Sequence, residues 1–214
     1  MKKLLVLLFS ILLFSSPSVF ADDISDFQIE GISIGDSLLD YMTEEEILKE
    51  IERTKGRHFY LKEPNKYSVI YSPDHLDNNL TTYDYLSFMI RNKGTNKYIT
   101  NKNENEKYTI LSVRGIIRYI EDFDSCIQKR DEIVESLSMM FPNAIKDEWF
   151  QSHSVDPSGN SIIDAINLLF DSGDYVQVHC SNYEETFRIK NNYSEGLSIT
   201  IRSKEIDSWL SDRK

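Results

Sequence analysis

The sequence predicts an α+β fold, in which a mainly antiparallel sheet packs against two or three helices. Stretches with the period of a strand follow one another in runs, and a stretch with helical period precedes each run. Strands that alternated with helices would instead predict a parallel sheet. The order helix, three strands, helix, three or four strands, helix indicates two α-β-β-β units, 22–119 and 120–214, although the two halves show no visible repeat.

Residues 1–21 have the pattern of a signal peptide. Lys2 and Lys3 precede an apolar run, and small or β-branched side chains at Val19 and Ala21 suit a signal peptidase. The run is too short to span a bilayer, which takes about 20 residues. No cysteine follows the cleavage point, so lipid attachment there is excluded. We therefore expect a periplasmic or secreted protein, with 22–214 as a single domain and no stable membrane insertion after cleavage.

The composition is that of a folded, acidic protein. The chain has 35 acidic and 24 basic residues, a formal net charge of −11, and two of its lysines lie in the leader. Such a surface repels phosphate backbones and anionic lipids, so we expect no nucleic-acid partner. Aromatic residues make up 12% of the chain, which argues against disorder.

The first half begins with a helical turn, "GDSLLDYM" at 35–42, and a helix over 43–55. Thr43 and Glu46 stand at the spacing of a capping box. Ile47, Leu48 and Ile51 are expected to face the core.

Strands are predicted at 66–72, 82–91 and 108–119, with a long polar hairpin loop at 92–107. Alternation places two sets of residues on the core face: Leu86, Phe88 and Ile90 in one strand, and Leu111, Val113, Gly115 and Ile117 in the next.

The second half begins with a helix from about Ile120 to Phe141, ended by Pro142. Its apolar stripe comprises Ile120, Phe123, Ile127, Val134, Leu137 and Phe141. Strands follow at 147–153, 161–170, 175–183 and 196–203, and a short amphipathic helix lies at 204–210. In the third of these strands, one face carries Val176, Val178 and Cys180, and the other carries Tyr175, Gln177 and His179.

The two cysteines, Cys126 and Cys180, are predicted to form a disulfide. An exported protein meets an oxidising compartment, and the pair is too sparse for a zinc site because neither belongs to a C-x-x-C motif. Since Cys180 shares a face with two valines, the bond would attach the 120–141 helix to the sheet.

The string Gly35-Asp36-Ser37-Leu38 matches the first sequence block of the GDSL, or SGNH, serine esterases, in which the serine is the nucleophile. The rest of the family pattern is missing: no Gly-x-Asn-Asp occurs, and no histidine has an aspartate three residues before it. Because a serine needs a positioned base, Ser37 is interpreted as part of a helix start capped by Asp36 or a neighbour.

The remaining candidates for chemistry are weak. The histidines, His58, His75, His153 and His179, form no zinc-binding spacing. Asp156, Ser158, Asn160 and Asp164 loosely resemble a calcium loop but lack the glycine and the final glutamate that such a loop requires. We predict no catalytic residues, no metal and no cofactor.

Four tyrosines are expected on the face of the sheet that points away from the apolar stripe: Tyr83, Tyr85, Tyr108 and Tyr175. Tyrosine half-buries well in strands and is enriched in protein interfaces. This face therefore indicates a packing or partner surface more strongly than a saccharide platform.

Three stretches look like an uncharacterised family of small exported bacterial proteins: "IEGISIGDSLLDYMTEEEI", "YTILSVRGIIRYIEDFDSCIQKRDEIVESLSMMFPNA" and "FDSGDYVQVHC". That resemblance places Cys126 and Cys180 in recurring positions and implies no activity. More distantly, the opening is similar to that of outer-membrane assembly lipoproteins and β-lactamase-inhibitor-like domains, which share a helix–helix–three-strand unit and bind other proteins. The likeness is one of fold alone.

These observations lead to a functional expectation. We expect a non-catalytic binding or interaction protein of the periplasm, with a protein partner in the cell envelope and an oligomeric state that the sequence leaves open. The alternative is a serine esterase of the GDSL type with Ser37 as nucleophile.

Overall fold

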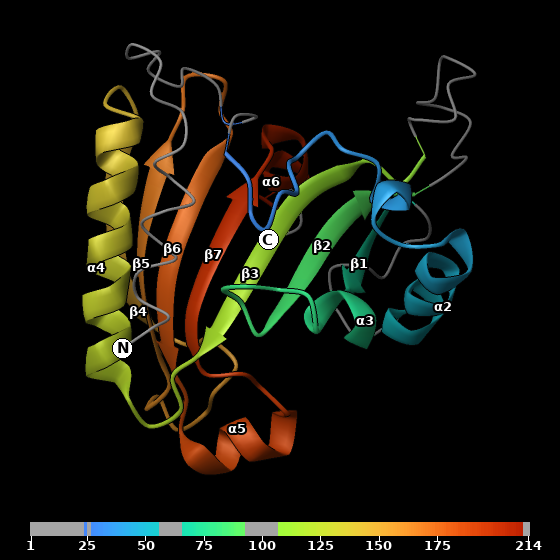
Figure 1. Cartoon of the computed structure of the whole chain (residues 1–214). Coiled ribbons are helices and arrows are strands. Elements are labelled where there is room, and N and C mark those ends of the chain that lie inside the picture. Colours follow the sequence, from blue (N-terminus) through green and yellow to red (C-terminus); the bar gives the residue numbers. More distant parts are fainter. Residues whose placement is uncertain (1–23, 25–26, 56–65, 93–106, 212–214) are drawn as a thin grey trace.

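The structure is a computed structural model that describes residues 24, 27–55, 66–92 and 107–211. Its centre is a seven-stranded antiparallel sheet in the order β1-β2-β3-β7-β6-β5-β4 (Figure 1). The α+β class predicted from the sequence is confirmed. The strands are β1 (Tyr67–Tyr71), β2 (Tyr85–Arg91), β3 (Ile110–Arg118), β4 (Ile145–Ser152), β5 (Ile162–Leu169), β6 (Tyr175–Asn182) and β7 (Gly196–Arg202). The helices are α2 (Glu44–Thr54), α3 (Asp74–Asp77), α4 (Phe123–Met140), α5 (Glu185–Asn191) and α6 (Lys204–Ser211).

The sheet consists of two meanders that are joined side by side. Strands β1, β2 and β3 pair in sequence order, as do β4, β5, β6 and β7, and the last strands of the two meanders pair with each other. One helix precedes each meander: α2 packs against β1, and α4 packs across β6 and β7. The strand runs match the predicted order, while a common origin of the two halves stays a prediction.

One face of the sheet forms the main core. Alternate residues of β2, β3, β7 and β6 point into it, and α4 and the segment before α2 cover it (Figure 1). Within that segment Leu38 is fully buried, and α2 begins with the predicted capping box of Thr43 and Glu46. The faces predicted for β2 and β6 agree with this core, whose strand residues include Leu86, Phe88, Ile90, Val176, Val178, Cys180, Leu197, Ile199 and Ile201.

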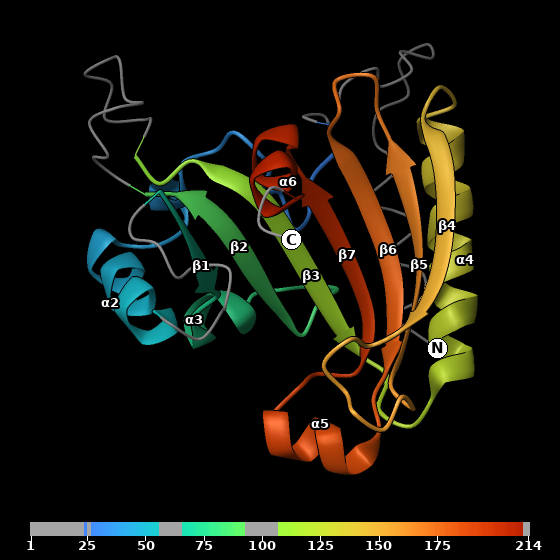
Figure 2. The same ribbon diagram turned by 180° about the vertical axis from the view of Figure 1, so that it is seen from behind.

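The opposite face of the sheet is only partly covered. Helix α6 packs there, with Ile206 and Trp209 against Tyr67 and Leu111 in a second, smaller apolar cluster. Figure 2 shows α6 near one end of this face and α5 near the other, with no described helix over the middle of β3, β7 and β6.

Leu111 was assigned to the wrong face. The pairing of β2 with β3 shifts register between Met89 and Ile90, so Ile90 faces Ile110 and Met89 faces Ser112. Leu111 is the extra residue of this bulge and joins the cluster beneath α6. An irregularity of one residue reverses the side to which a side chain points, and the alternation of residue types does not reveal it.

Two of the four tyrosines also lie on the opposite face from the one expected. Tyr83 packs against the main core, where a Cβ on Gly115 would lie 2.4 Å from its ring, so the glycine makes room for that ring. Tyr108 is buried in the same core, with its hydroxyl donating to Glu44 at 3.2 Å. Only Tyr85 and Tyr175 lie in strands on the expected face, the one that points away from the main core. The four tyrosines therefore form no single platform.

Helix faces depart from prediction at two positions. Leu48 is 53% exposed, and Ile120 is 50% exposed because it precedes α4, which begins at Phe123. Helices α3 and α5 were not predicted, since each is short and polar. Most of the hairpin loop expected at 92–107 and the whole leader 1–21 lie outside the described residues.

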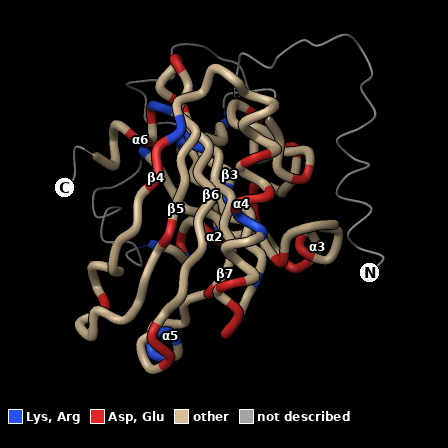
Figure 3. The backbone as a smooth tube through the Cα atoms, turned by 90° about the vertical axis from the view of Figure 1, so that its left-hand side faces the viewer, with Lys and Arg blue, Asp and Glu red and all other residues tan. Residues whose placement is uncertain are grey.

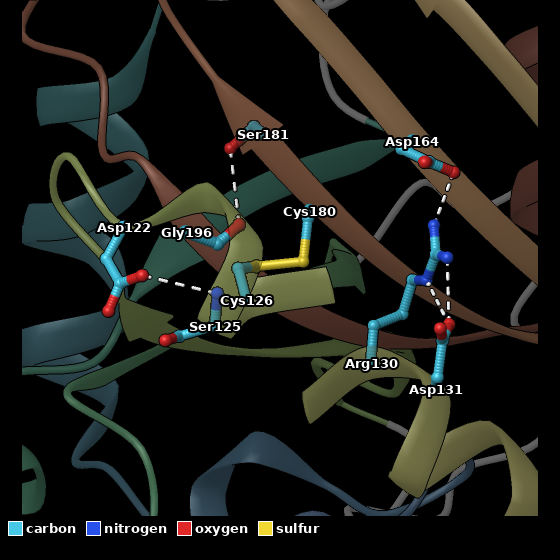
Figure 4. Close-up of a disulfide and its surroundings, with 9 residues drawn as sticks. All are labelled: Asp122, Ser125, Cys126, Arg130, Asp131, Asp164, Cys180, Ser181 and Gly196. Atoms are coloured by element: carbon cyan, nitrogen blue, oxygen red, sulfur yellow. Dashed lines mark hydrogen bonds and ion pairs between the residues drawn. A yellow bond between two sulfur atoms is a disulfide. The ribbon is translucent and has the colours of Figure 1, made fainter. Parts of the chain in front are cut away.

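Helix α4 is fixed to the sheet at two successive turns (Figure 4). Cys126 and Cys180 form a disulfide, with Sγ atoms 1.97 Å and Cα atoms 6.0 Å apart. One turn further along the helix, Arg130 forms an ion pair with Asp164. Because Asp164 and Cys180 are direct cross-strand partners on β5 and β6, an i, i+4 pair on the helix faces a matched pair on the sheet.

Breaking the disulfide is expected to destabilise the protein. The loop between the cysteines spans 54 residues, and freeing its ends in the unfolded chain should lower the free energy of unfolding by about 4 kcal/mol. Urea denaturation of the oxidised protein and of the C126A/C180A variant measures the difference. Equal unfolding free energies, or an intact mass without the loss of two hydrogen atoms, would contradict this role.

Candidate functional site

Ser37 caps a turn in the structure. Its side chain accepts a hydrogen bond from the amide of Leu39 at 3.3 Å, starts the 3-10 turn Leu38–Asp40 and donates to the carbonyl of Lys107 at 2.8 Å. The cap is Ser37 itself and not Asp36, whose carboxylate instead accepts from the amide of Ser33 and the hydroxyl of Tyr41.

The described histidines have contacts elsewhere. His75 lies 3.4 Å from Glu46, His153 packs among the rings of Tyr183, Phe187 and Tyr193, and His179 lies on the sheet face opposite Cys180. His58 lies outside the described residues. None of these described histidines forms a hydrogen bond with Ser37, whose side chain bonds to the backbone of Leu39 and Lys107.

The loosely calcium-like loop closes on itself. Asp156 accepts hydrogen bonds from the amide of Ser161 at 2.9 Å and from the amide and hydroxyl of Ser158 at 2.9 and 2.7 Å. The bonds from Ser161 and Ser158 hold the pKa of Asp156 well below its usual range. Asp164 points away to Arg130, and the described residues contain no cluster of three or more potential metal-ligating side chains.

One candidate site is a groove between α4 and β4, with a volume of about 520 Å³. It forms because α4 packs on β6 and β7, which leaves the outer strands β5 and β4 extending beyond the helix. Its lining comes from α4 (Arg130, Asp131, Val134, Glu135, Ser138, Met139), from β4 (Lys146, Glu148) and from β5 (Ile166).

Strand β4 forms the outer wall of the groove and is unusually exposed. It is the last strand of the sheet and pairs with β5 alone among the described strands. Seven of its eight side chains are exposed and Trp149 is half-buried, whereas a strand of a packed sheet normally buries one face. Ile145 and Phe150 are 64% and 63% exposed, and Met139 on the facing helix is 66% exposed. Apolar side chains in contact with water beside an unpaired strand edge are typical of a surface that binds a partner.

The groove has an excess of negative charge. Arg130 is neutralised by Asp164 and Asp131, and Lys146 contacts Glu148 at 2.6 Å. Glu135 has no cationic partner among the described residues. Figure 3 shows charged residues of both signs along α4 and the first part of β4.

These features suit binding better than catalysis. An edge strand offers backbone N–H and C=O groups to an added strand, and side-chain pockets beside it can read alternate residues. The sequence did indicate that 147–153 is a strand, but the edge position and the groove were not foreseen. The available signal was the stretch Ile145–Ser152, which lacks the alternation of apolar and polar residues seen in the other strands.

Comparisons of the chain with protein-family models, with curated proteins and with solved structures return no match. The resemblances to exported bacterial proteins and to outer-membrane assembly lipoproteins therefore stay predictions. Among the described residues, no helix is long and apolar enough to cross a membrane.

Replacing Arg130 should loosen the helix that forms one wall of the groove. Arg130 is buried and Asp164 is partly buried, so Arg130→Met leaves a carboxylate without its partner and should cost about 2 kcal/mol of unfolding free energy. Lys129→Met is the matched control, because Lys129 pairs with the exposed Glu132 on the same helix and should cost less than about 1 kcal/mol.

The double variant R130M/D164L removes both charges of the ion pair. It should therefore recover much of the stability that Arg130→Met loses. Thermal and urea unfolding of the four proteins measure the series. If Arg130→Met and Lys129→Met behave alike, the ion pair does not hold the helix.

Proposed function

We propose that this protein is an exported, non-catalytic binding protein of the cell envelope that holds an extended segment of a partner protein. The segment would add to the free edge of β4 and place its side chains in the groove beside α4. The single observation that carries the proposal is β4 itself, a strand with one edge that no described strand pairs with and with exposed side chains on both faces.

The backbone of β4 supports this mode of binding. In an antiparallel pair, half of the amides and carbonyls of a strand point to one neighbour and half to the other. Strand β4 uses one set with β5, and no other described strand pairs with the second set, which an added strand could use. Main-chain hydrogen bonds of this kind supply affinity without requiring a particular sequence.

The side chains beside β4 predict the chemistry of the partner segment. Phe150 and Met139 offer apolar contact, while Glu135 and the surplus carboxylates favour positive charge. We therefore propose a segment in which apolar residues alternate with Lys or Arg. The acidic surface of the whole chain should attract the same basic segment before contact.

A peptide selection tests this chemistry. Random peptides displayed on phage are selected on the immobilised, disulfide-bonded protein, and the selected sequences should alternate apolar and basic residues. Binding of the best peptide should fall at least about tenfold in Phe150→Asp, since that change removes an exposed apolar contact of β4 that a carboxylate does not replace. Ile189→Asp is the control, because Ile189 is equally exposed, at 65%, but lies on α5.

Glu135→Lys provides a second arm of the selection. This change should weaken basic peptides and leave the protein folded, because Glu135 is exposed and has no ion-pair partner in the described ranges. Selected peptides without basic residues, or peptides that bind Phe150→Asp and wild type equally, would overturn the assignment of the groove.

Export has a direct test of its own. The leader pattern predicts that protein recovered from the envelope begins at Asp22, which N-terminal sequencing or intact mass would show. Deletion of 2–21 should keep the protein in the cytoplasm with Cys126 and Cys180 reduced, because thiols stay reduced there. Full-length protein in the cytoplasmic fraction would contradict export.

A further inference from the structure

The sheet face opposite α4 carries a polar patch at its centre, where no described helix covers it (Figure 2). Three neighbouring strands contribute: Arg114 of β3 faces Thr200 of β7, which faces Gln177 of β6. Next to them, Ser198 of β7 faces His179 of β6. Ser198, Thr200 and His179 are buried, whereas Arg114 and Gln177 are half-buried. Polar residues occur on many sheet faces, so the polarity by itself does not define a site.

The arginines of β3 distinguish this patch from an ordinary polar face of a sheet. Five of the seven arginines in the described ranges form ion pairs with carboxylates: Arg53, Arg91, Arg130, Arg188 and Arg202. The other two, Arg114 and Arg118, have no carboxylate within ion-pair distance in the described residues, although acidic residues outnumber basic ones in the chain. Both lie on the same face of the same strand.

Arg114 is held so that its outer nitrogens are free. Its Nε donates to Ser198 Oγ at 2.5 Å, which fixes the side chain across β7. Neither Nη group has a hydrogen-bond partner among the described residues. A guanidinium that is half-buried, fixed at Nε and open at both Nη atoms offers the paired donors that match a phosphate or carboxylate.

The neighbours of Arg114 leave its charge uncompensated. His179 is buried and its Nδ1 lies 3.1 Å from Gln177 Oε1. Burial lowers the pKa of His179 well below its ordinary value, and the positive charges of Arg114 and Arg202 act in the same direction. The imidazole is therefore neutral at pH 7 and adds no charge, while Arg114 keeps its positive charge with no carboxylate within ion-pair distance among the described residues.

Arg118 extends the patch along β3. Its guanidinium carbon lies 5.3 Å from the centre of the Tyr85 ring, and the residue is exposed. Four residues of extended strand separate the two arginines by about 13 Å. Arg114 can therefore hold one anionic group, and Arg118 can reach a second group of the same ligand.

We infer that Arg114, fixed by Ser198 and assisted by Arg118, forms a binding site for an oxyanion, a phosphate or carboxylate group. The site lies on the opposite sheet face from the α4–β4 groove and does not depend on the function proposed for that groove. The oxyanion belongs either to a free small molecule or to the headgroup of an anionic lipid, which present the same chemistry to a guanidinium.

Nuclear magnetic resonance can test the site on the full, disulfide-bonded mature protein. Inorganic phosphate or acetate is added at constant ionic strength, with the Nε–Hε signal of Arg114 and the backbone amides of β3 and β7 as readouts. Saturable shifts should appear at these positions. In Arg114→Gln the dissociation constant should rise at least about tenfold, as expected for the loss of charge-assisted hydrogen bonds.

Three further variants separate the site from general charge effects. Arg114→Lys keeps the charge without the paired donors and should bind more weakly than wild type, and Arg118→Gln should weaken binding less than Arg114→Gln does. Arg53→Gln is the control, because Arg53 pairs with Glu50 on α2, and it should bind as wild type. Backbone spectra that match wild type show that each variant is folded.

Co-sedimentation with vesicles identifies the source of the oxyanion. Binding to phosphatidylglycerol vesicles but not phosphatidylcholine vesicles, lost in Arg114→Gln, would assign a lipid headgroup. Saturable phosphate or acetate shifts without sedimentation would assign a free anion. Linear shifts that are the same in wild type and Arg114→Gln, together with no vesicle binding, would overturn the proposal.

Discussion

The position of α4 on the sheet is the constraint on which the rest of the structure depends. Cys126 and Arg130 lie one helical turn apart, and their partners Cys180 and Asp164 lie opposite each other on adjacent strands. The two contacts fix both the position and the rotation of the helix, because shifting it by one residue would break both of them. With α4 held over β6 and β7, the outer strand β4 is left without a helix to cover it, and the groove follows from that geometry.

The two faces of the sheet then differ in what they can bind. Beside α4, an unpaired strand edge, exposed apolar side chains and excess carboxylates suit an extended basic segment. On the opposite face, Arg114 and Arg118 are arginines without carboxylate partners in the described residues and suit an oxyanion. The two proposals therefore assign ligands of opposite charge to the two faces of one sheet.

The fold class and most strand faces could be predicted, because the alternation of side chains reports directly which face a strand buries. Leu111 could not be placed correctly, since a bulge at Met89/Ile90 shifts it by one residue. The position of the Tyr83 ring depends on Gly115, which is distant in sequence and makes room for that ring.

The groove could not be predicted from the sequence either. The pairing of β3 with β7 leaves β4 at the edge of the sheet, and it joins residues far apart in the chain. For Ser37, the sequence lacks the base that an esterase needs, and the structure shows that its side chain caps a turn.

Amide hydrogen exchange on the mature protein, with and without a selected basic peptide, tests the central claim most directly. In the free protein, the amides of β4 that point away from β5 should exchange rapidly, since they have no strand partner in the described structure. Addition of the peptide should protect those alternate amides of β4 and leave α5 unchanged. Protection confined to another part of the molecule, or no protection of β4 when the peptide is bound, would contradict strand addition at this edge.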